Sequence, residues 1–143
     1  MRFMMIVKAS TDSEKGAMPS QEMVDAMMSY NEELVKAGVL LAGEGLHPSS
    51  NAIRISYPVP GGKPKVTDGP FAETKELIAG FWMIQVKSRE EAIEWAMRAP
   101  DPHGGGQGQI ELRQVFETEE VTDNPESIAR ENALREQLEK LKQ

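Results

Sequence analysis

The stretch that decides the fold runs from Met18 to Ala42 and reads MPSQEMVDAMMSYNEELVKAGVLLA. Apolar side chains recur in it at alternating spacings of four and three residues, at Met23, Met27, Tyr30, Leu34 and Ala37. That spacing places them in one stripe along an α-helix. Pro19 suits the first turn of such a helix, and Gly38 suits its left-handed end. The stretch therefore predicts a helix that covers a core with one face and leads directly into a strand at residues 39–42.

Strand patterns lie on both sides of this helix. Further strands are expected, in chain order, at residues 2–8, 52–57, 65–67, 77–87 and 110–116. Ser88 and Glu91 have the spacing of a capping box, which predicts a second helix that stops before Pro100. The resulting order is β-α-β-β-α-β with an elaborated middle hairpin. Such an α+β fold carries both helices on one face of its sheet, so the uncovered face predicts a homodimer.

The composition changes after Glu117, which divides the chain into a domain at residues 1–117 and a C-terminal extension at residues 118–143. Residues 117–143 hold eight acidic and four basic side chains. Asn124-Pro125 is a good helix start, and a thin apolar stripe follows it. We expect an acidic linker and an amphipathic helix. The helix is either solvated on all sides or an arm that packs across a partner subunit.

The composition also excludes several classes of function. The chain has 143 residues, no cysteine and a formal net charge of −7. Without cysteine there is no thiolate nucleophile, iron–sulfur cluster or cysteine zinc site. An acidic chain without a basic stripe is poorly suited to direct nucleic-acid binding. The longest apolar runs reach only about ten residues, too few to span a bilayer, so we expect a cytoplasmic protein that does not enter a membrane.

The turn Asp68-Gly69-Pro70-Phe71 is the most tightly specified segment. Gly69 permits backbone angles that other residues avoid, and Pro70 fixes its own. Asp68 can bond to the amides of its own turn, so it is either a turn-former or a catalytic acid or base. Charged and hydroxyl side chains crowd the next positions, at Glu73, Thr74, Lys75 and Glu76.

The string from Asp68 to Glu76, DGPFAETKE, resembles the signature of the DGPF branch of the YCII-related family. The resemblance spans residues 2–117 and includes the strings YNEEL at residues 30–34, GEGL at 43–46 and GFW at 80–82. It implies a ferredoxin-like fold whose sheets pair into a dimeric α/β barrel. It also implies a link to an extracytoplasmic-function sigma factor.

Related proteins are thought to use a His–Asp pair, and one branch is a dehydrochlorinase. The first helix of this chain has no histidine, so that pair is not carried over.

Several residues are candidates for a site in a cleft next to residues 68–76. Asp68 and His47 are the candidate catalytic pair, although a loop histidine is also a common surface residue. The candidate ligand-binding residues are Tyr30, Glu44, Phe71, Glu73, Lys75 and Arg113. Tyr30 is equally explained by core packing. Arg113 is expected in a central strand, where burial would require a carboxylate partner such as Asp68, Glu44 or Glu73.

Two functions follow from these residues. The first is a small-molecule-binding or regulatory module, and the second is an enzyme that uses Asp68 as general acid or base, with His47 or Tyr30, on a small polar substrate. No spacing typical of a metal site is present and no cofactor motif, so neither a metal nor a cofactor is expected. A buried Asp68 within reach of His47 or Tyr30 would favour the enzyme.

Overall fold

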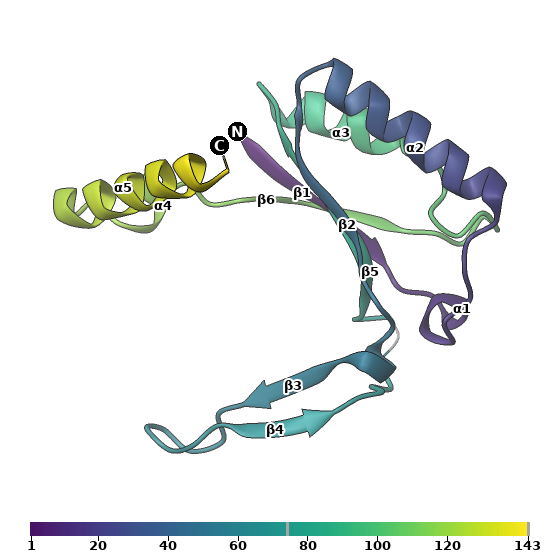
Figure 1. Ribbon diagram of the computed structural model, residues 1–143, viewed down its shortest axis with the longest axis horizontal. Coiled ribbons are helices and arrows are strands. Elements are labelled where there is room, and N and C mark those ends of the chain that lie inside the picture. The colour runs from purple at the N-terminus through teal and green to yellow at the C-terminus, as the bar shows by residue number, and fades with distance from the viewer. Residues whose placement is uncertain (74, 143) are drawn as a thin grey trace.

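The protein, described by a computed structural model at residues 1–73 and 75–142, is an α+β fold of the ferredoxin-like type (Figure 1). Its four-stranded antiparallel sheet has the strand order β2-β5-β1-β6. The central strands are β1 (Arg2–Lys8) and β5 (Ile78–Gln85), and the edge strands are β2 (Leu40–Gly45) and β6 (Ile110–Gln114). The predicted β-α-β-β-α-β order is confirmed, with additions in the middle and at the C-terminus.

Two helices cover one face of this sheet, α2 (Gln21–Lys36) and α3 (Arg89–Arg98) (Figure 1). Ser20 caps the start of α2 by accepting the Met23 amide at 3.1 Å. At the start of α3, Ser88 accepts the Glu91 amide as predicted, but the Glu91 carboxylate accepts the Lys87 amide at 2.8 Å. The capping box is therefore only half formed, and the second contact reaches one residue further back.

The core lies between the sheet and these two helices. Every second residue of the central strands points into it, and the buried set is Phe3, Met5, Val7, Trp82, Ile84 and Val86. The helices contribute Tyr30, Leu34, Ala92 and Trp95, and Val39, just before β2, completes it. The Trp82 indole donates a hydrogen bond to the Asn31 side chain at 2.7 Å. This pair satisfies the one polar group of the large ring at the core boundary.

The opposite face of the sheet, which we call the open face, carries two rows of side chains in register. Directly opposed residues of antiparallel strands share a face. The first row is Glu44, Phe81, Ile6 and Glu111, and the second is Ala42, Met83, Met4 and Arg113. The centre of each row is apolar and its charges lie on the edge strands. The expected uncovered face is therefore present within one chain.

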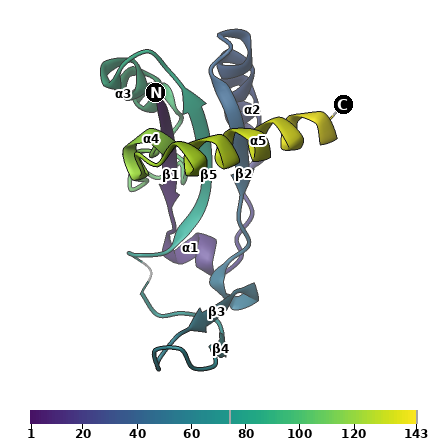
Figure 2. The same ribbon diagram turned by 90° about the vertical axis from the view of Figure 1, so that its left-hand side faces the viewer.

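Two arms project from the sheet on the side of the open face (Figures 1 and 2). The hairpin arm, residues 53–68, consists of β3 (Ile53–Ser56) and β4 (Lys65–Asp68), which form a separate two-stranded sheet. The C-terminal arm, residues 117–142, contains α4 (Thr118–Val121) and α5 (Pro125–Leu141). Asn124 caps α5 and Pro125 opens it, as predicted. No helix in the described ranges has the length and apolar character needed to cross a membrane.

Candidate functional site

The turn around Gly69 is built by a close approach of two backbones. The Gly69 amide donates to the Ala52 carbonyl at 2.9 Å, next to the 3-10 helix η1 (Ser49–Asn51). A Cβ at Gly69 would lie 1.8 Å from the Ser49 carbonyl oxygen, which no side chain can tolerate. The following peptide bond to Pro70 is cis. Glycine is thus required because of the space available rather than because of a left-handed backbone.

Ser49 connects this turn to the short helix α1 (Thr11–Glu14). Its hydroxyl oxygen accepts the Phe71 amide at 3.0 Å, and the same hydroxyl donates to the Glu14 carboxylate. The Ser49 amide also donates to Glu14, at 3.0 Å. The Ser49 side chain is buried, so these bonds are shielded from water. Three segments that are far apart in the sequence are therefore held together at the base of the hairpin arm.

Arg54 is the partner of the charged residues that follow the turn. Its guanidinium lies 3.7 Å from the centre of the Phe71 ring and donates to the Glu73 carboxylate at 3.2 Å. The pKa of Glu73 is held below its ordinary value by a hydrogen bond from its own backbone amide and then by Arg54. Phe71 and Glu73, both expected to bind a ligand, are thus engaged with Arg54. Lys75 is exposed, and Thr74 lies outside the described residues.

The three groups of the catalytic hypothesis occupy separate environments. Asp68 is exposed at the end of β4. His47 is exposed before η1, where its Nδ1 atom lies 3.1 Å from the Asn51 amide nitrogen. Tyr30 is 3% exposed and lies in the core behind the sheet. The structure does not bring these side chains together into one acid–base group.

Packing in the core accounts for the contacts of Tyr30. Its hydroxyl donates to the Trp95 carbonyl at 2.6 Å, and its ring meets Trp82 edge to face at 5.3 Å. Burial raises the pKa of Tyr30 to about 12, because an ionised phenolate would be poorly solvated there. Tyr30 thus lies in the core, and its role as a ligand-binding residue stays a prediction.

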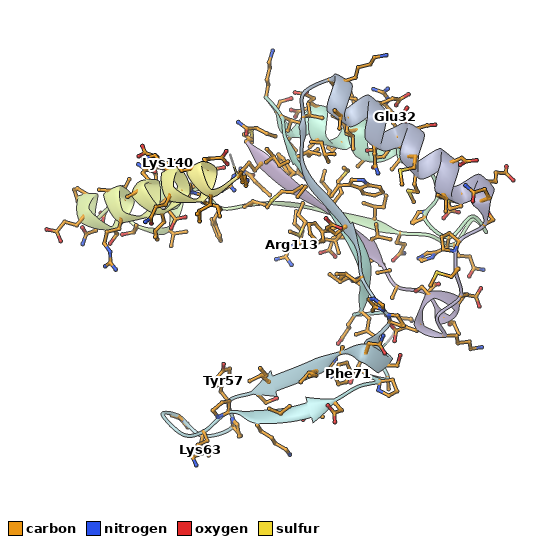
Figure 3. All side chains as sticks on the ribbon, in the orientation of Figure 1. Glu32, Tyr57, Lys63, Phe71, Arg113 and Lys140 are labelled. Carbon is orange, nitrogen blue, oxygen red and sulfur yellow. The ribbon has the colours of Figure 1, made fainter. Side chains whose placement is uncertain are left out.

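Arg113 also differs from its prediction. It was expected in a central strand with a carboxylate from Asp68, Glu44 or Glu73, but β6 is an edge strand. Its side chain is 71% exposed, points from the open face toward the side of the arms, and lies 3.8 Å from Glu111 (Figure 3). At an edge strand the guanidinium stays in water, so the desolvation that would demand a buried partner does not arise. Glu44 lies on the opposite edge of the same face.

Two hollows stand out on the surface, and neither is the expected cleft next to residues 68–76. The first, about 450 Å³, lies between α3 and β6 and has an apolar lining that includes Ile93, Met97 and Leu112. The second, about 390 Å³, lies along Lys8 and residues 109–111. In the described part of the chain, no group of three or more His, Asp or Glu side chains has an arrangement that could hold a metal ion.

Three residues of this region were not predicted, namely Glu14, Ser49 and Arg54. Glu14 and Ser49 lie in stretches that read as loops, where nothing marks a long-range contact. Arg54 had a usable signal, because it occupies a strand predicted to pair with residues 65–67. In the structure it is opposite Thr67, which is the residue before Asp68.

Comparisons with known proteins give a family. A family model described as the YCII-related domain matches residues 1–119. Translation initiation factor IF-2 from Chlorobium limicola is 30% identical over 128 residues, which are 82% of this chain and 12% of that protein. An uncharacterized protein of Rhizobium meliloti is 36% identical over 70 residues, which are 49% of this chain and 55% of that protein. The chain thus spans only part of the length of these relatives.

A solved structure also matches. It is 5-chloro-2-hydroxyhydroquinone dehydrochlorinase from Burkholderia phenoliruptrix AC1100, in complex with 2,5-dihydroxybenzoquinone. The match has a TM-score of 0.47 and 13% identity, and it covers 84% of this chain and 98% of that one.

Proposed function

The chain belongs to the YCII-related family, and on this premise we propose that it is a small-molecule-binding or regulatory module rather than an enzyme that acts through Asp68. The observation that carries the proposal is that no hydrogen bond or ion pair joins Asp68, His47 and Tyr30, all three of which the structure describes. A general acid or base must lie within hydrogen-bond reach of its assisting groups and substrate. Here Asp68 is exposed, His47 is next to Asn51, and Tyr30 is bonded to Trp95.

The open face offers a better place for a ligand than the turn. Phe81 and Ile6 form an apolar centre, and Glu44 and Arg113 supply charges at the two edges. Apolar surface with a few converging polar groups is the usual composition of a small-molecule site. The guanidinium of Arg113 suits an anionic group such as a carboxylate, which it can bind through two nitrogens. We therefore propose a small, partly apolar anion as the ligand.

The wider setting of the site forms part of the same proposal. The string at residues 68–76 supports placement in the DGPF branch of the family. The open face, with its apolar centre, supports a homodimer in which two such faces meet. A functional link to an extracytoplasmic-function sigma factor is the regulatory context that the family resemblance implies, and we propose a cytoplasmic location with it.

A thermal-shift screen tests the proposal. The wild-type protein is heated with panels of aliphatic carboxylates, aromatic carboxylates, phosphorylated metabolites and neutral analogues. A ligand present at 100 times its dissociation constant stabilises the fold by about 2.7 kcal/mol, which shifts the melting temperature by several degrees. We expect an anionic class to produce that shift and its neutral analogues to produce none.

The Arg113→Gln variant shows whether the shift arises at the open face. Arg89→Gln is the matched control, because it removes the same charge at the start of α3, on the other side of the sheet. Arg113→Gln should abolish the shift while Arg89→Gln retains it. A screen in which no class moves the melting temperature, or in which both variants respond like the wild type, contradicts the proposal.

A further inference from the structure

The two arms expose apolar side chains that have no cover in a single chain. On the hairpin arm these are Ile53, Ile55, Tyr57, Val59 and Val66, and on the C-terminal arm they are Val121, Leu134, Leu138 and Leu141. All of them are exposed by more than half. The C-terminal arm also lies almost entirely outside the part of the chain that matches the family model. Large apolar patches on an extended arm indicate a partner.

The total surface area supports the same conclusion. The chain exposes 10672 Å², whereas a compact monomer of 15.8 kDa exposes about 7,300 Å². The difference, about 3,400 Å², is more than the roughly 1,000–2,500 Å² that each chain contributes to an obligate homodimer interface. A partner can therefore cover the arms as well as the open face.

The base of the C-terminal arm is fixed to the sheet. The Arg2 guanidinium donates to both carboxylate oxygens of Glu117, at 3.0 and 3.2 Å, and to the Phe116 carbonyl at 3.1 Å. This ion pair holds the pKa of Glu117 below its ordinary value. The direction in which the arm leaves β6 is thus set by a forked contact to β1.

The two arms carry opposite charge. The hairpin arm has the basic residues Arg54, Lys63 and Lys65, with Asp68 as its one acid. The C-terminal arm has eight acidic and four basic side chains. Opposite charges on facing surfaces favour association, and like charges oppose it. The two arms are therefore complementary in charge to each other, and each arm would be repelled by a second copy of itself.

Symmetry decides which arms can meet in a dimer. The arms leave opposite ends of the sheet toward the same side (Figures 1 and 2). One possible twofold axis runs along the viewing direction of Figure 1. A half-turn about this axis brings the C-terminal arm of each copy to the hairpin arm of the other, so that two equivalent contacts form. A half-turn about the vertical axis of that view would instead bring like arms together, against their charges.

From these observations we propose that the two copies in the homodimer clasp each other reciprocally, the C-terminal arm of each packing on the hairpin arm of its partner. The inference rests on the homodimer proposed above and adds its orientation and its second contact surface. The arm helix is then an interface element, not a solvated tail.

Charge reversal in the full-length chain tests the clasp. The hairpin variant carries Lys63→Glu and Lys65→Glu, and the arm variant carries Glu119→Lys, Asp123→Lys and Glu136→Lys, all at exposed positions. Dimer dissociation constants are measured by analytical ultracentrifugation at low salt. Each variant alone should weaken the dimer by about tenfold or more, and the chain with all five changes should recover it.

Mixtures show whether the two arms make charge-dependent contacts between copies, and the homodimers show which arms meet. The hairpin variant mixed with the arm variant should form heterodimers close to wild-type affinity, because both of its clasps join opposite charges. If like arms met, this heterodimer would also join opposite charges, so the homodimers decide between the two arrangements. In the like-arm arrangement each variant alone would dimerise as tightly as the wild type, because its facing arms carry like charges before and after the change. A dimer that is indifferent to the hairpin variant and to the arm variant therefore overturns the clasp and leaves the homodimer intact. A monomer at every concentration overturns both, while ligand binding is judged separately by the thermal shifts.

Cysteine pairs give a readout that does not depend on charge. Because the chain has no cysteine, Tyr57→Cys on the hairpin arm and Leu138→Cys on α5 each introduce a single thiol. A bis-maleimide reagent should join the two variants to each other in a mixture and leave each variant alone mostly unlinked. Efficient linking of Leu138→Cys to itself contradicts the proposal.

Discussion

The hydroxyl of Ser49 accepts the backbone amide of Phe71 at 3.0 Å, which ties the residue after Gly69-Pro70 to a turn twenty-two positions earlier in the chain. The same hydroxyl donates to Glu14. The segment that is most distinctive in the sequence thus fixes the base of the hairpin arm. The close backbone approach explains the glycine at position 69, and the hydrogen bond from the Phe71 amide to Ser49 holds Phe71 in place.

Gly69→Ala should destabilise the protein strongly. The added Cβ would lie 1.8 Å from the Ser49 carbonyl oxygen, so the backbone of η1 or of the turn must move. We expect a loss of about 3 kcal/mol or more in the free energy of unfolding, at the upper end for overpacking. Chemical denaturation followed by circular dichroism measures it.

Gly45→Ala is the matched control for that substitution. A Cβ at Gly45 meets nothing within 4 Å, and the residue ends the edge strand β2. Its free energy of unfolding should stay within about 0.5 kcal/mol of the wild type. Equal losses at the two glycines would show that the close approach to Ser49 does not determine stability.

Ser49→Ala should loosen the turn at residues 69–71 without adding bulk. It removes the acceptor of the Phe71 amide and a donor to Glu14, and it leaves these groups partly shielded. The expected cost is about 1–3 kcal/mol. Hydrogen exchange at the Phe71 amide should become faster by at least tenfold, while exchange in β1 and β5 changes much less. Ser50→Ala, next to it and exposed, should alter neither.

The elements with strong periodicity were predictable from the sequence. The alternation in β5 places Trp82 and Ile84 on the face that is buried, and the stripe that contains Tyr30 and Leu34 is the buried face of α2. In these elements burial follows the repeat of the backbone, so the sequence carries the information locally. The uncovered face of the sheet followed from the element order alone.

The site was less predictable, because its contacts depend on tertiary placement. Arg113 has the pattern of a strand residue whether β6 lies at the centre or the edge of the sheet, and only the strand order decides its exposure. Glu14 and Ser49 meet across 35 positions without any periodic signal. The orientation of the two arms is set by Arg2 and by the turn at Gly69, and neither contact is encoded by spacing.

The Glu73 carboxyl gives a prediction for pH. Its pKa lies below 4.5 in the folded state because its own amide and Arg54 both stabilise the charged form. A carboxyl with a lowered folded pKa stabilises the fold above its unfolded pKa, and that contribution is lost as the pH falls through the folded value. NMR titration of the Glu73 side chain should therefore show a midpoint below 4.5. In Arg54→Gln the midpoint should rise but stay below 4.5, because the hydrogen bond from the backbone amide of Glu73 to its own carboxylate remains.

Tyr30→Phe separates the core role of this residue from a role in binding. The substitution removes one hydroxyl that donates to the Trp95 carbonyl at 2.6 Å and leaves that buried acceptor unpaired. The expected loss is about 1–3 kcal/mol in the free energy of unfolding, with the edge-to-face contact to Trp82 retained. Tyr57→Phe, exposed on the hairpin arm, should cost less than about 0.5 kcal/mol.

The ligand response of Tyr30→Phe should match that of the wild type, because Tyr30 lies on the helix side of the sheet and Arg113 on the open face. A variant with normal stability and an abolished ligand response would return Tyr30 to the binding site.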